Sequence, residues 1–157
     1  MNSQLNQQIG ELGETLVARW LNQQNWEILH CRWRCRWGEI DLIAQGYLAQ
    51  SEEKILAFVE VKTRSRGNWD ADGLMAITLA KQAKLKQTAR LFLAQHPEKQ
   101  DFPCQFDVAL VRYQQIHSTS LTATSQPLPV SSVELGQPVL VAGHQLILQD
   151  YIQLAFD

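Results

Sequence analysis

Hydrophobic side chains near the start of the chain recur at steps of three and four residues. The members of this stripe are Leu5, Ile9, Leu12, Leu16 and Trp20. Because an α-helix has about 3.6 residues per turn, side chains at these steps share one face of the helix. The pattern therefore predicts an amphipathic helix from Ser3 to about Gln24.

The hydrophobic period changes to two after this helix, and a period of two is typical of β-strands. Apolar and polar residues alternate between Trp26 and Ala44, and the run ILAFVEVKTR from Ile55 to Arg64 is short and rich in Val, Ile and Phe. The segment QGYLAQSEEK between the two runs is polar and contains Gly46. We therefore expect it to connect two strands of a hairpin.

A second long helix is predicted from about Thr78 to Gln95, after a cluster of Gly, Asn and Asp around Ser65 to Gly73. The predicted helix contains no Gly or Pro, and the dipeptide His96-Pro97 would end it. Its apolar face would comprise Leu85, Ala89 and Phe92.

The remainder of the chain is expected to complete a sheet. Phe106 to Tyr113 has the pattern of an apolar strand, whereas Ser118 to Pro129 is rich in Ser, Thr and Pro and is predicted to be a loop. The runs PVLVA and QLIL are strand-like, and a short closing helix is predicted near Tyr151 to Phe156. This order of elements predicts a mixed α/β sandwich, in which both long helices cover a central sheet.

Composition narrows the class of protein. The 157 residues suit one domain, and 14 basic against 16 acidic side chains leave a net charge of −2, so any phosphate-binding surface must be local. The chain has three cysteines and no signal-peptide pattern at its start, which favours a reducing, cytoplasmic setting. Charged or amide residues interrupt every apolar run, so no membrane span is predicted.

Two short runs, GEIDLI at 38–43 and FVEVK at 58–62, place acidic side chains in apolar strands. Strand side chains alternate between faces, so Glu39 and Asp41 are expected to share one face, with Ile40 and Leu42 on the other. In the second run Glu60 and Lys62 share a face by the same rule. If the two strands pair, Asp41, Glu60 and Lys62 can converge on one spot.

Such a spot has the chemistry of phosphodiester hydrolysis. Two carboxylates and a backbone carbonyl, here that of Val61, suit Mg²⁺, which prefers oxygen ligands. A neighbouring lysine can orient or help deprotonate the attacking water and offset charge on the phosphate. The alternative for Glu60 and Lys62 is a salt-bridged pair on a solvated face, which is common. Asp41 fits that alternative less well, because an unpaired acid is costly to bury.

The order GEID followed by an apolar strand ending in EVK resembles the PD-(D/E)xK nuclease core, with Ile40-Asp41 in place of Pro-Asp. Five segments in order are similar to the bacterial YraN family: GELGETLVARWL at 10–21, WRCRWGEIDLIA at 33–44, FVEVKTR at 58–64, AKQAKL at 80–85 and FDVALV at 106–111. That family has an endonuclease-like fold akin to archaeal Holliday junction resolvases. The resemblance implies a restriction-endonuclease-like α/β domain over residues 1–157, with a variable C-terminal extension from about residue 114.

The resemblance also implies a catalytic site. Asp41, Glu60 and Glu14 would hold Mg²⁺ or Mn²⁺, and Lys62 would act on the attacking water. Gly10 and Gly13 lie beside Glu14 on the predicted helix, which would let another backbone or a metal site approach. An exposed helical glutamate is the alternative for Glu14. The chain departs from the family pattern at Gln105, where an arginine commonly precedes FDV.

These residues lead to a functional hypothesis: a DNA endonuclease that cleaves phosphodiester bonds at branched or otherwise structured sites, with a homodimer suggested only by the resolvase analogy. The candidate nucleic-acid-binding residues are Arg32, Arg34, Arg36, Arg64, Lys81 and Lys84. For most of the helical lysines, a solvated helix face is the alternative. For the whole protein, the alternatives are a non-catalytic nucleic-acid-binding module that keeps the fold and a scaffold role.

The segment CRWRCRWGEID from Cys31 to Asp41 has its own difficulty, because one unbroken strand would put its tryptophans on the same face as its acids. Gly38 can supply a bend or bulge that separates them. We therefore predict two pieces. The first has Trp33, Trp37 and the cysteines inward and the three arginines outward, and the second presents Asp41. A zinc site at His30, Cys31 and Cys35 is disfavoured, because no second ligand pair follows at usable spacing.

Overall fold

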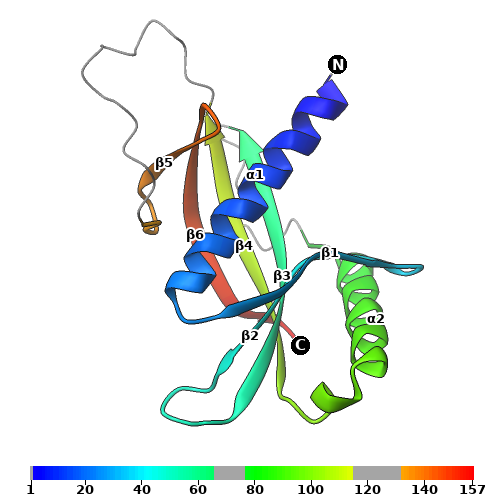
Figure 1. Ribbon diagram of the computed structural model, residues 1–157. Coiled ribbons are helices and arrows are strands. Elements are labelled where there is room, and N and C mark those ends of the chain that lie inside the picture. Colours follow the sequence, from blue (N-terminus) through cyan, green and yellow to red (C-terminus); the bar gives the residue numbers. More distant parts are fainter. Residues whose placement is uncertain (1, 66–76, 115–131) are drawn as a thin grey trace, which may run out of the picture.

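A six-stranded sheet forms the centre of the computed structural model, with the strands in the order β1-β2-β3-β4-β6-β5 (Figure 1). The structure describes residues 2–65, 77–114 and 132–157. Its elements are α1 (Asn2–Gln23), β1 (Glu27–Cys35), β2 (Gly38–Tyr47), β3 (Lys54–Ser65), α2 (Leu79–Gln95), the short 3₁₀ helix η2 (Pro97–Lys99), β4 (Cys104–Gln114), β5 (Pro138–Val141) and β6 (His144–Phe156). Strands β3 and β4 are parallel, and the other neighbours are antiparallel.

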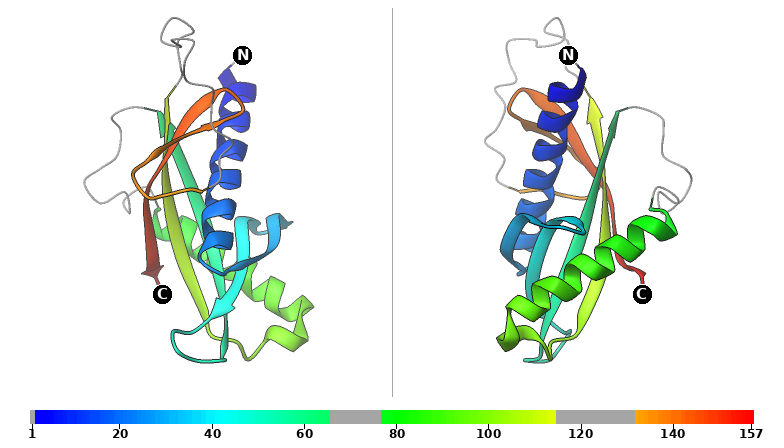
Figure 2. Two further views of the ribbon diagram at one scale, coloured as in Figure 1. Left: turned by 60° about the vertical axis from the view of Figure 1, so that its left-hand side comes forward. Right: turned by 90° about the vertical axis from the view of Figure 1, so that its right-hand side faces the viewer.

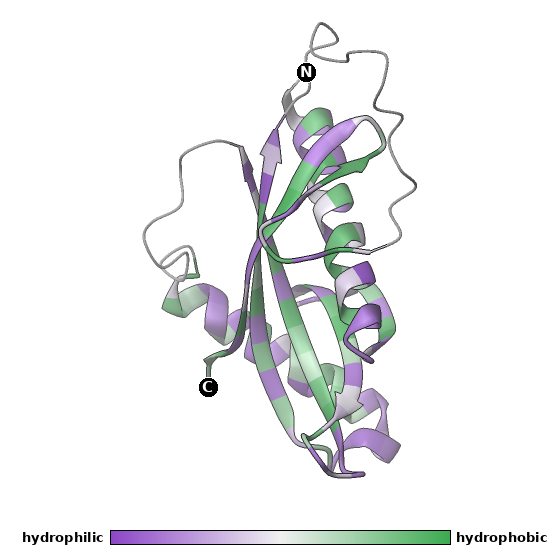
Figure 3. Ribbon diagram, turned by 90° about the vertical axis from the view of Figure 1, so that its left-hand side faces the viewer, coloured by the Kyte–Doolittle hydropathy of each residue, from purple (hydrophilic) through white to green (hydrophobic). Residues whose placement is uncertain are grey.

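The two long helices cover opposite faces of the sheet, as the turned views in Figure 2 show. On the α1 face, Leu16 and Val17 belong to one buried cluster with Leu42 and Val59. On the α2 face, the buried cluster comprises Ile40, Ile43, Leu56, Phe58, Leu85, Ala89 and Phe92. The central strands are largely apolar, whereas both helices carry polar and apolar residues (Figure 3). The predicted mixed α/β arrangement of a sheet between two helices is confirmed.

The second helix begins and ends where the sequence predicts. Thr78 is its N-cap, and the Thr78 side chain accepts a hydrogen bond of 3.1 Å from the Lys81 backbone N–H. The helix ends at Gln95, and Pro97 starts η2. Capping by a threonine hydroxyl satisfies one of the N–H groups that the first turn leaves without a partner.

The closing helix predicted near Tyr151 to Phe156 is wrong, because this segment is part of strand β6. A buried aspartate on β4 explains the difference. The Asp107 carboxylate accepts hydrogen bonds from the Tyr151 hydroxyl, at 2.6 Å, and from the Leu154 backbone N–H, at 3.0 Å. The Gln105 amide donates to the same carboxylate. The bonds from Tyr151 and Leu154 hold β6 against β4, and these two donors are distant from Asp107 in the sequence.

The loop predicted from Ser118 to Pro129 lies outside the described residues, and so does most of the cluster from Ser65 to Gly73. The described part of the predicted C-terminal extension forms β5 and β6, which complete one side of the sheet.

The segment from Cys31 to Asp41 forms two pieces, as predicted, but a tight hairpin separates them rather than a bend. Strand β1 ends at Cys35, β2 begins at Gly38, and these two residues are paired. Gly38 has a φ of 150°, which residues with a side chain rarely adopt. Trp33 points inward and packs edge-on against Phe92, with ring centroids 5.4 Å apart.

Two side chains expected to point inward do not. Trp37 lies in the two-residue turn and is 43% exposed, and Cys31 is exposed. The turn carries Trp37 beyond the sheet, so no helix covers it. The alternation predicted for β2 also fails at Asp41, because Ile40 packs on the α2 face and Leu42 on the α1 face. A local irregularity therefore separates the tip of the hairpin from the rest of the sheet.

Helix α1 approaches β3 closely at one glycine, and this contact provides a stability test. A Cβ atom at Gly13 would lie 2.1 Å from Thr63 Oγ1, whereas a Cβ atom at Gly10 meets nothing within 4 Å. We expect Gly13→Ala to lower the free energy of unfolding by about 1–3 kcal/mol through overpacking. Gly10→Ala, its matched control, should raise that free energy by about 0.5–1 kcal/mol because alanine favours helix. Urea unfolding measures both, and equal effects would contradict the close approach.

Candidate functional site

The sheet opens at the point where β2 parts from β3. Their pairing runs from Tyr47 and Lys54 to Leu42 and Val59 and stops there. Asp41, which directly precedes Leu42, does not pair with β3 through its backbone. Its side chain makes the contact instead, because Asp41 Oδ2 accepts a hydrogen bond of 2.8 Å from the Val61 N–H. Asp41 is thereby held at the edge of β3, in the opening between the strands.

Three acidic side chains meet around this opening. Glu14 on α1 and Glu39 and Asp41 on β2 each offer a carboxylate oxygen, and these oxygens all lie within 4.8 Å of one another. Glu60 on β3 is close enough for its negative charge to act on Asp41. Three carboxylates therefore meet at the opening, and Glu60, which was expected to share the cation with Asp41 and Glu14, lies near Asp41 but outside this group of three.

The carboxylate of Glu60 is almost buried and contacts two lysines. Lys62 Nζ and Lys81 Nζ each lie 3.3 Å from Glu60 Oε1. The Lys62 side chain is 16% exposed and that of Lys81 is 42% exposed. Lys62 thus lies largely inside the protein, whereas Lys81 reaches Glu60 across the surface of α2.

The surroundings of Asp41 disfavour its charged form. Burial is the main cause, the negative charge of Glu60 is the second, and together they raise the pKa of Asp41 to about 8 although the Val61 N–H lowers it. Burial also raises the pKa of Glu14, and the hydrogen bond from Arg32 opposes that rise. A divalent cation would reverse both effects, because it stabilises ionised carboxylates.

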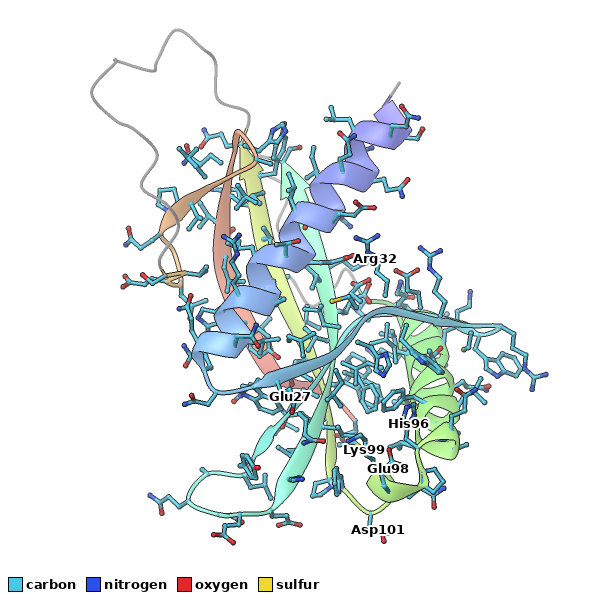
Figure 4. The ribbon with its side chains drawn as sticks, in the orientation of Figure 1. Glu27, Arg32, His96, Glu98, Lys99 and Asp101 are labelled. Carbon is cyan, nitrogen blue, oxygen red and sulfur yellow. The ribbon has the colours of Figure 1, made fainter. Side chains whose placement is uncertain are left out.

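Arg32 points toward the acids and not outward as predicted. Its Nε donates to Glu14 at 2.8 Å and its Nη1 to Glu11 at 3.0 Å, so the guanidinium links β1 to α1 (Figure 4). Arg32 has a φ of 52°. This left-handed backbone interrupts the alternation of β1 between the pairs Cys31–Leu42 and Trp33–Ile40. The irregularity places Trp33 on the α2 face and Arg32 beside α1.

The other predicted nucleic-acid-binding residues lie around the site at different distances from the acids. Arg34 forms an ion pair with Glu39, and Arg36 lies over the Trp37 ring at the tip of the hairpin. Arg64 and Lys84 are exposed, on β3 and α2. Arg34 and Arg32 neutralise acids of the cluster, whereas Arg36, Arg64 and Lys84 have side chains available to an external partner.

Glu39 is the acidic residue that the sequence-based site omits. It lies two residues before Asp41, and the expected strand alternation put both on one face, which was a usable signal. Asp41, Glu60 and Glu14 were predicted as the ligands, and the structure brings Glu39 into the same cluster as Asp41 and Glu14.

The donor set fits a hard divalent cation. Every candidate ligand is a carboxylate oxygen, which suits Mg²⁺ or Mn²⁺ better than zinc. Within residues 2–65, 77–114 and 132–157, no other group of three His, Cys, Asp or Glu side chains is placed to share an ion. His96 does not belong to the site, because it lies at the C-terminal end of α2, apart from Arg32 (Figure 4).

The raised pKa of Asp41 predicts a stability effect that depends on pH. An unfolded aspartate ionises near pH 4 and folded Asp41 near 8, so the folded protein should lose stability as pH rises through this window. Asp41→Asn removes that loss and keeps an acceptor for the Val61 N–H. In chelator, we expect the variant to gain roughly 1–3 kcal/mol over wild type between pH 4 and 8.

Thermal or urea unfolding across this pH range measures the difference, with the exposed Asp101→Asn as the matched control. A gain that does not change with pH would contradict the assigned environment of Asp41.

In the part of the chain that the structure describes, no helix is long and apolar enough to cross a membrane.

Comparison with known proteins identifies relatives over nearly the whole chain. The family described as "Uncharacterised protein family UPF0102" matches residues 13–111. A UPF0102 protein of Acaryochloris marina is 53% identical over 157 residues, covering 96% of this chain and 91% of the relative. UPF0102 proteins of Trichodesmium erythraeum and Synechocystis are 50% and 46% identical, covering 94% of this chain and 87% and 97% of the relatives. The matched residues include Glu14, Glu39, Asp41, Glu60 and Lys62.

Proposed function

The chain belongs to the UPF0102 family, and we propose that it is a DNA endonuclease that hydrolyses phosphodiester bonds with the help of Mg²⁺ or Mn²⁺. The observation that carries the proposal is the environment of Asp41. This carboxylate is mostly buried, is fixed by the Val61 N–H, and faces the charges of Glu60, Glu14 and Glu39. Like charges crowded in a desolvated site are costly to stability unless a cation or a proton compensates them.

In this proposal Asp41, Glu60, Glu14 and Glu39 hold the cation. A bound Mg²⁺ would supply Lewis-acid stabilisation of the negative charge that develops on the phosphate. Lys62 orients the attacking water, and the positive charge of its ammonium group, which lies beside Glu60 in a largely buried position, favours loss of the water proton. The burial of Lys62 limits competition from solvent and strengthens its electrostatic effect.

The arrangement of these residues also supports a restriction-endonuclease-like assignment. Ile40-Asp41 lies on β2, Glu60-Val61-Lys62 lies on the neighbouring strand β3, and the Val61 N–H links the two segments. Helix α1 contributes Glu14 from one face of the mixed sheet. We assign the PD-(D/E)xK type on this arrangement and on the resemblance of the sequence.

One observation favours a second candidate, a nucleic-acid-binding module without catalysis. Arg32 pairs with Glu14, and Arg34 pairs with Glu39. Two of the acids therefore already have a cationic partner from the same chain. In such a module the acids would be structural, and the exposed cations would contact phosphates. The lack of an arginine or lysine against Asp41 among the described ion pairs favours the nuclease.

The test is a cleavage and binding assay on a panel of DNA substrates. Purified protein is incubated with linear, nicked and four-way-junction DNA in Mg²⁺, Mn²⁺ or chelator. The nuclease proposal expects cleavage with either metal and none in chelator. Binding without cleavage under every metal would favour the module, and the absence of both binding and cleavage would count against both candidates.

A further inference from the structure

The tip of the β1–β2 hairpin carries an exposed tryptophan close to the acidic site. Trp37 lies in the two-residue turn that joins the strands, and the residue is 43% exposed. The hairpin extends beyond α2 in the view of Figure 1. Glu39, a member of the acidic cluster, follows Trp37 by two residues. The turn therefore presents a large aromatic side chain to solvent beside the site.

The contact between Trp37 and Arg36 gives this aromatic side chain a definite character. An exposed apolar residue alone selects no partner, because such residues are common on protein surfaces. Here the Arg36 guanidinium lies over the Trp37 ring, 4.8 Å from its centroid. This cation–π contact restrains the ring and covers one of its two faces. The exposed remainder of the ring is a flat platform with a cation attached to it.

The charged side chains of the hairpin tip are basic. Residues 31–38 contain three arginines and no acid. Arg36 is exposed, and the side chain of Arg34 is 69% exposed. Glu39 is the first acid after the turn, and its charge is already paired with Arg34. The surface around Trp37 therefore favours an anionic partner.

Helix α2 adds a further cation beside the base of the hairpin. A Cβ atom at Gly38 would lie 3.7 Å from Thr88 Oγ1, so the hairpin passes α2 at Thr88. Lys84 lies one turn before Thr88 and is exposed. Cations next to an aromatic platform suit nucleic acid, because every nucleotide carries both an anionic phosphate and a flat base.

The position of Trp37 also selects the kind of base that it can contact. Inside a duplex both faces of a base are covered by its neighbours, so an aromatic side chain stacks on bases that are unpaired or splayed out. Along the strand, Trp37 lies about 7 Å from Glu39 and about 13 Å from Asp41, at about 3.3 Å per residue. Stacked nucleotides rise by about 3.4 Å each, so these distances correspond to about two to four nucleotides.

We infer that Trp37 stacks on an unpaired base of the DNA substrate, while Arg34 and Arg36 contact the adjoining phosphates. The substrate class is then DNA whose duplex is interrupted about two to four nucleotides from the cleaved bond. This inference rests on the proposed nuclease function and adds to it the residue that recognises the interruption. A second copy of the chain is the other occupant that an exposed tryptophan suits, and the experiment below distinguishes the two.

Trp37→Ala and Trp37→Phe test the inference together. Trp37 is exposed, so both variants should fold, and phenylalanine keeps an aromatic face. Tyr47→Ala is the matched control, because Tyr47 is a 58% exposed aromatic residue at the opposite end of β2. Fluorescence anisotropy in chelator and in Ca²⁺ compares a fully paired duplex with the same duplex carrying one bulged 2-aminopurine, whose own fluorescence reports stacking.

We expect wild type and Tyr47→Ala to bind the bulged duplex at least about tenfold more tightly than the paired duplex. Trp37→Ala should lose this preference and keep its affinity for the paired duplex, whereas Trp37→Phe should stay within a few-fold of wild type. Wild type should quench the 2-aminopurine fluorescence, and Trp37→Ala should not. The inference is overturned if Trp37→Ala keeps the preference and the quenching, or if Tyr47→Ala loses as much.

Sedimentation in the absence of DNA tests the second occupant. If wild type self-associates, Trp37→Ala is monomeric and the two bind both duplexes equally, the tip is an interface between copies and the inference is overturned. We expect Trp37→Ala to have the same molar mass as wild type.

The same variants separate this inference from the nuclease proposal. Metal-dependent cleavage by a wild type that shows no preference for the bulged duplex would overturn the inference about Trp37 alone. A preference that Trp37→Ala removes, with no cleavage under any metal, would overturn the nuclease proposal and leave the hairpin tip as a binding site.

Discussion

Asp41→Asn is expected to abolish metal-dependent cleavage, with a loss of about 10³-fold or more in the rate under saturating Mg²⁺. The substitution removes one negative charge at the centre of the acidic cluster and preserves an oxygen that can accept the Val61 N–H. The protein should therefore remain folded while its affinity for the cation falls. Single-turnover cleavage measures the first effect, and isothermal titration with Mg²⁺ measures the second without relying on activity.

Glu11→Gln is the matched control for this variant. Glu11 lies one turn before Glu14 on α1 and shares Arg32 with Glu14, but it does not belong to the three-carboxylate cluster. We expect its cleavage rate and Mg²⁺ affinity to stay within a few-fold of wild type, because an exposed ion pair contributes little. Cleavage that persists in Asp41→Asn, or an equal loss in Glu11→Gln, would contradict a cation site centred on Asp41.

Much of the acidic site could be predicted because local rules govern its residues. Asp41 lies in an apolar strand and Glu60 and Lys62 share the α2 face of β3 by alternation, so local rules identify all three residues. The contact itself depends on an irregularity, because the pairing of β2 with β3 ends at Leu42 and the Asp41 side chain accepts from the Val61 N–H. The placement of Glu14 could be predicted from the helical period and from the two glycines beside it. The boundaries of α2 followed from Thr78 and His96-Pro97, which are local signals as well.

The features that sequence reasoning missed depend on backbone irregularities. Arg32 adopts a left-handed conformation, which turns its guanidinium toward Glu14 and reverses the orientation predicted by alternation. A two-residue turn leaves Trp37 exposed at the tip of the hairpin. A single bulge or a positive φ moves the side chain of every later residue in the strand to the other face of the sheet. The hydrophobic pattern of the sequence predicts neither feature.

The error at the C-terminus has a different cause, because it arises from a contact between distant residues. Tyr151 to Phe156 lies in a strand because β6 pairs with β4 and because Asp107 binds the Tyr151 hydroxyl and the Leu154 N–H. Propensity within six residues cannot represent an acceptor that lies more than forty positions away, and tertiary contacts routinely override it.

Lys62→Met is expected to lower the cleavage rate by about 10²–10³-fold and to leave Mg²⁺ binding largely intact. Methionine keeps most of the aliphatic volume of the lysine but removes the ammonium group that lies 3.3 Å from Glu60. Lys81→Met is the matched control, since Lys81 Nζ lies at the same distance from the same oxygen atom. If Lys62 only neutralised Glu60, the two substitutions would have similar effects.

We expect the effects to differ because the two lysines differ in position. Lys62 follows Val61, whose N–H holds Asp41, and its side chain is largely buried, whereas Lys81 is more exposed and reaches Glu60 from α2. Loss of an exposed contact should slow cleavage by less than about tenfold. Cleavage rates measured against pH provide a second readout. Removal of a group that takes part in proton transfer should change the shape of the pH profile, whereas removal of a neutralising charge should lower the rate at every pH and leave the shape unchanged. Equal losses with unchanged profiles would show that Lys62 balances the charge of Glu60 and takes no part in activating the water.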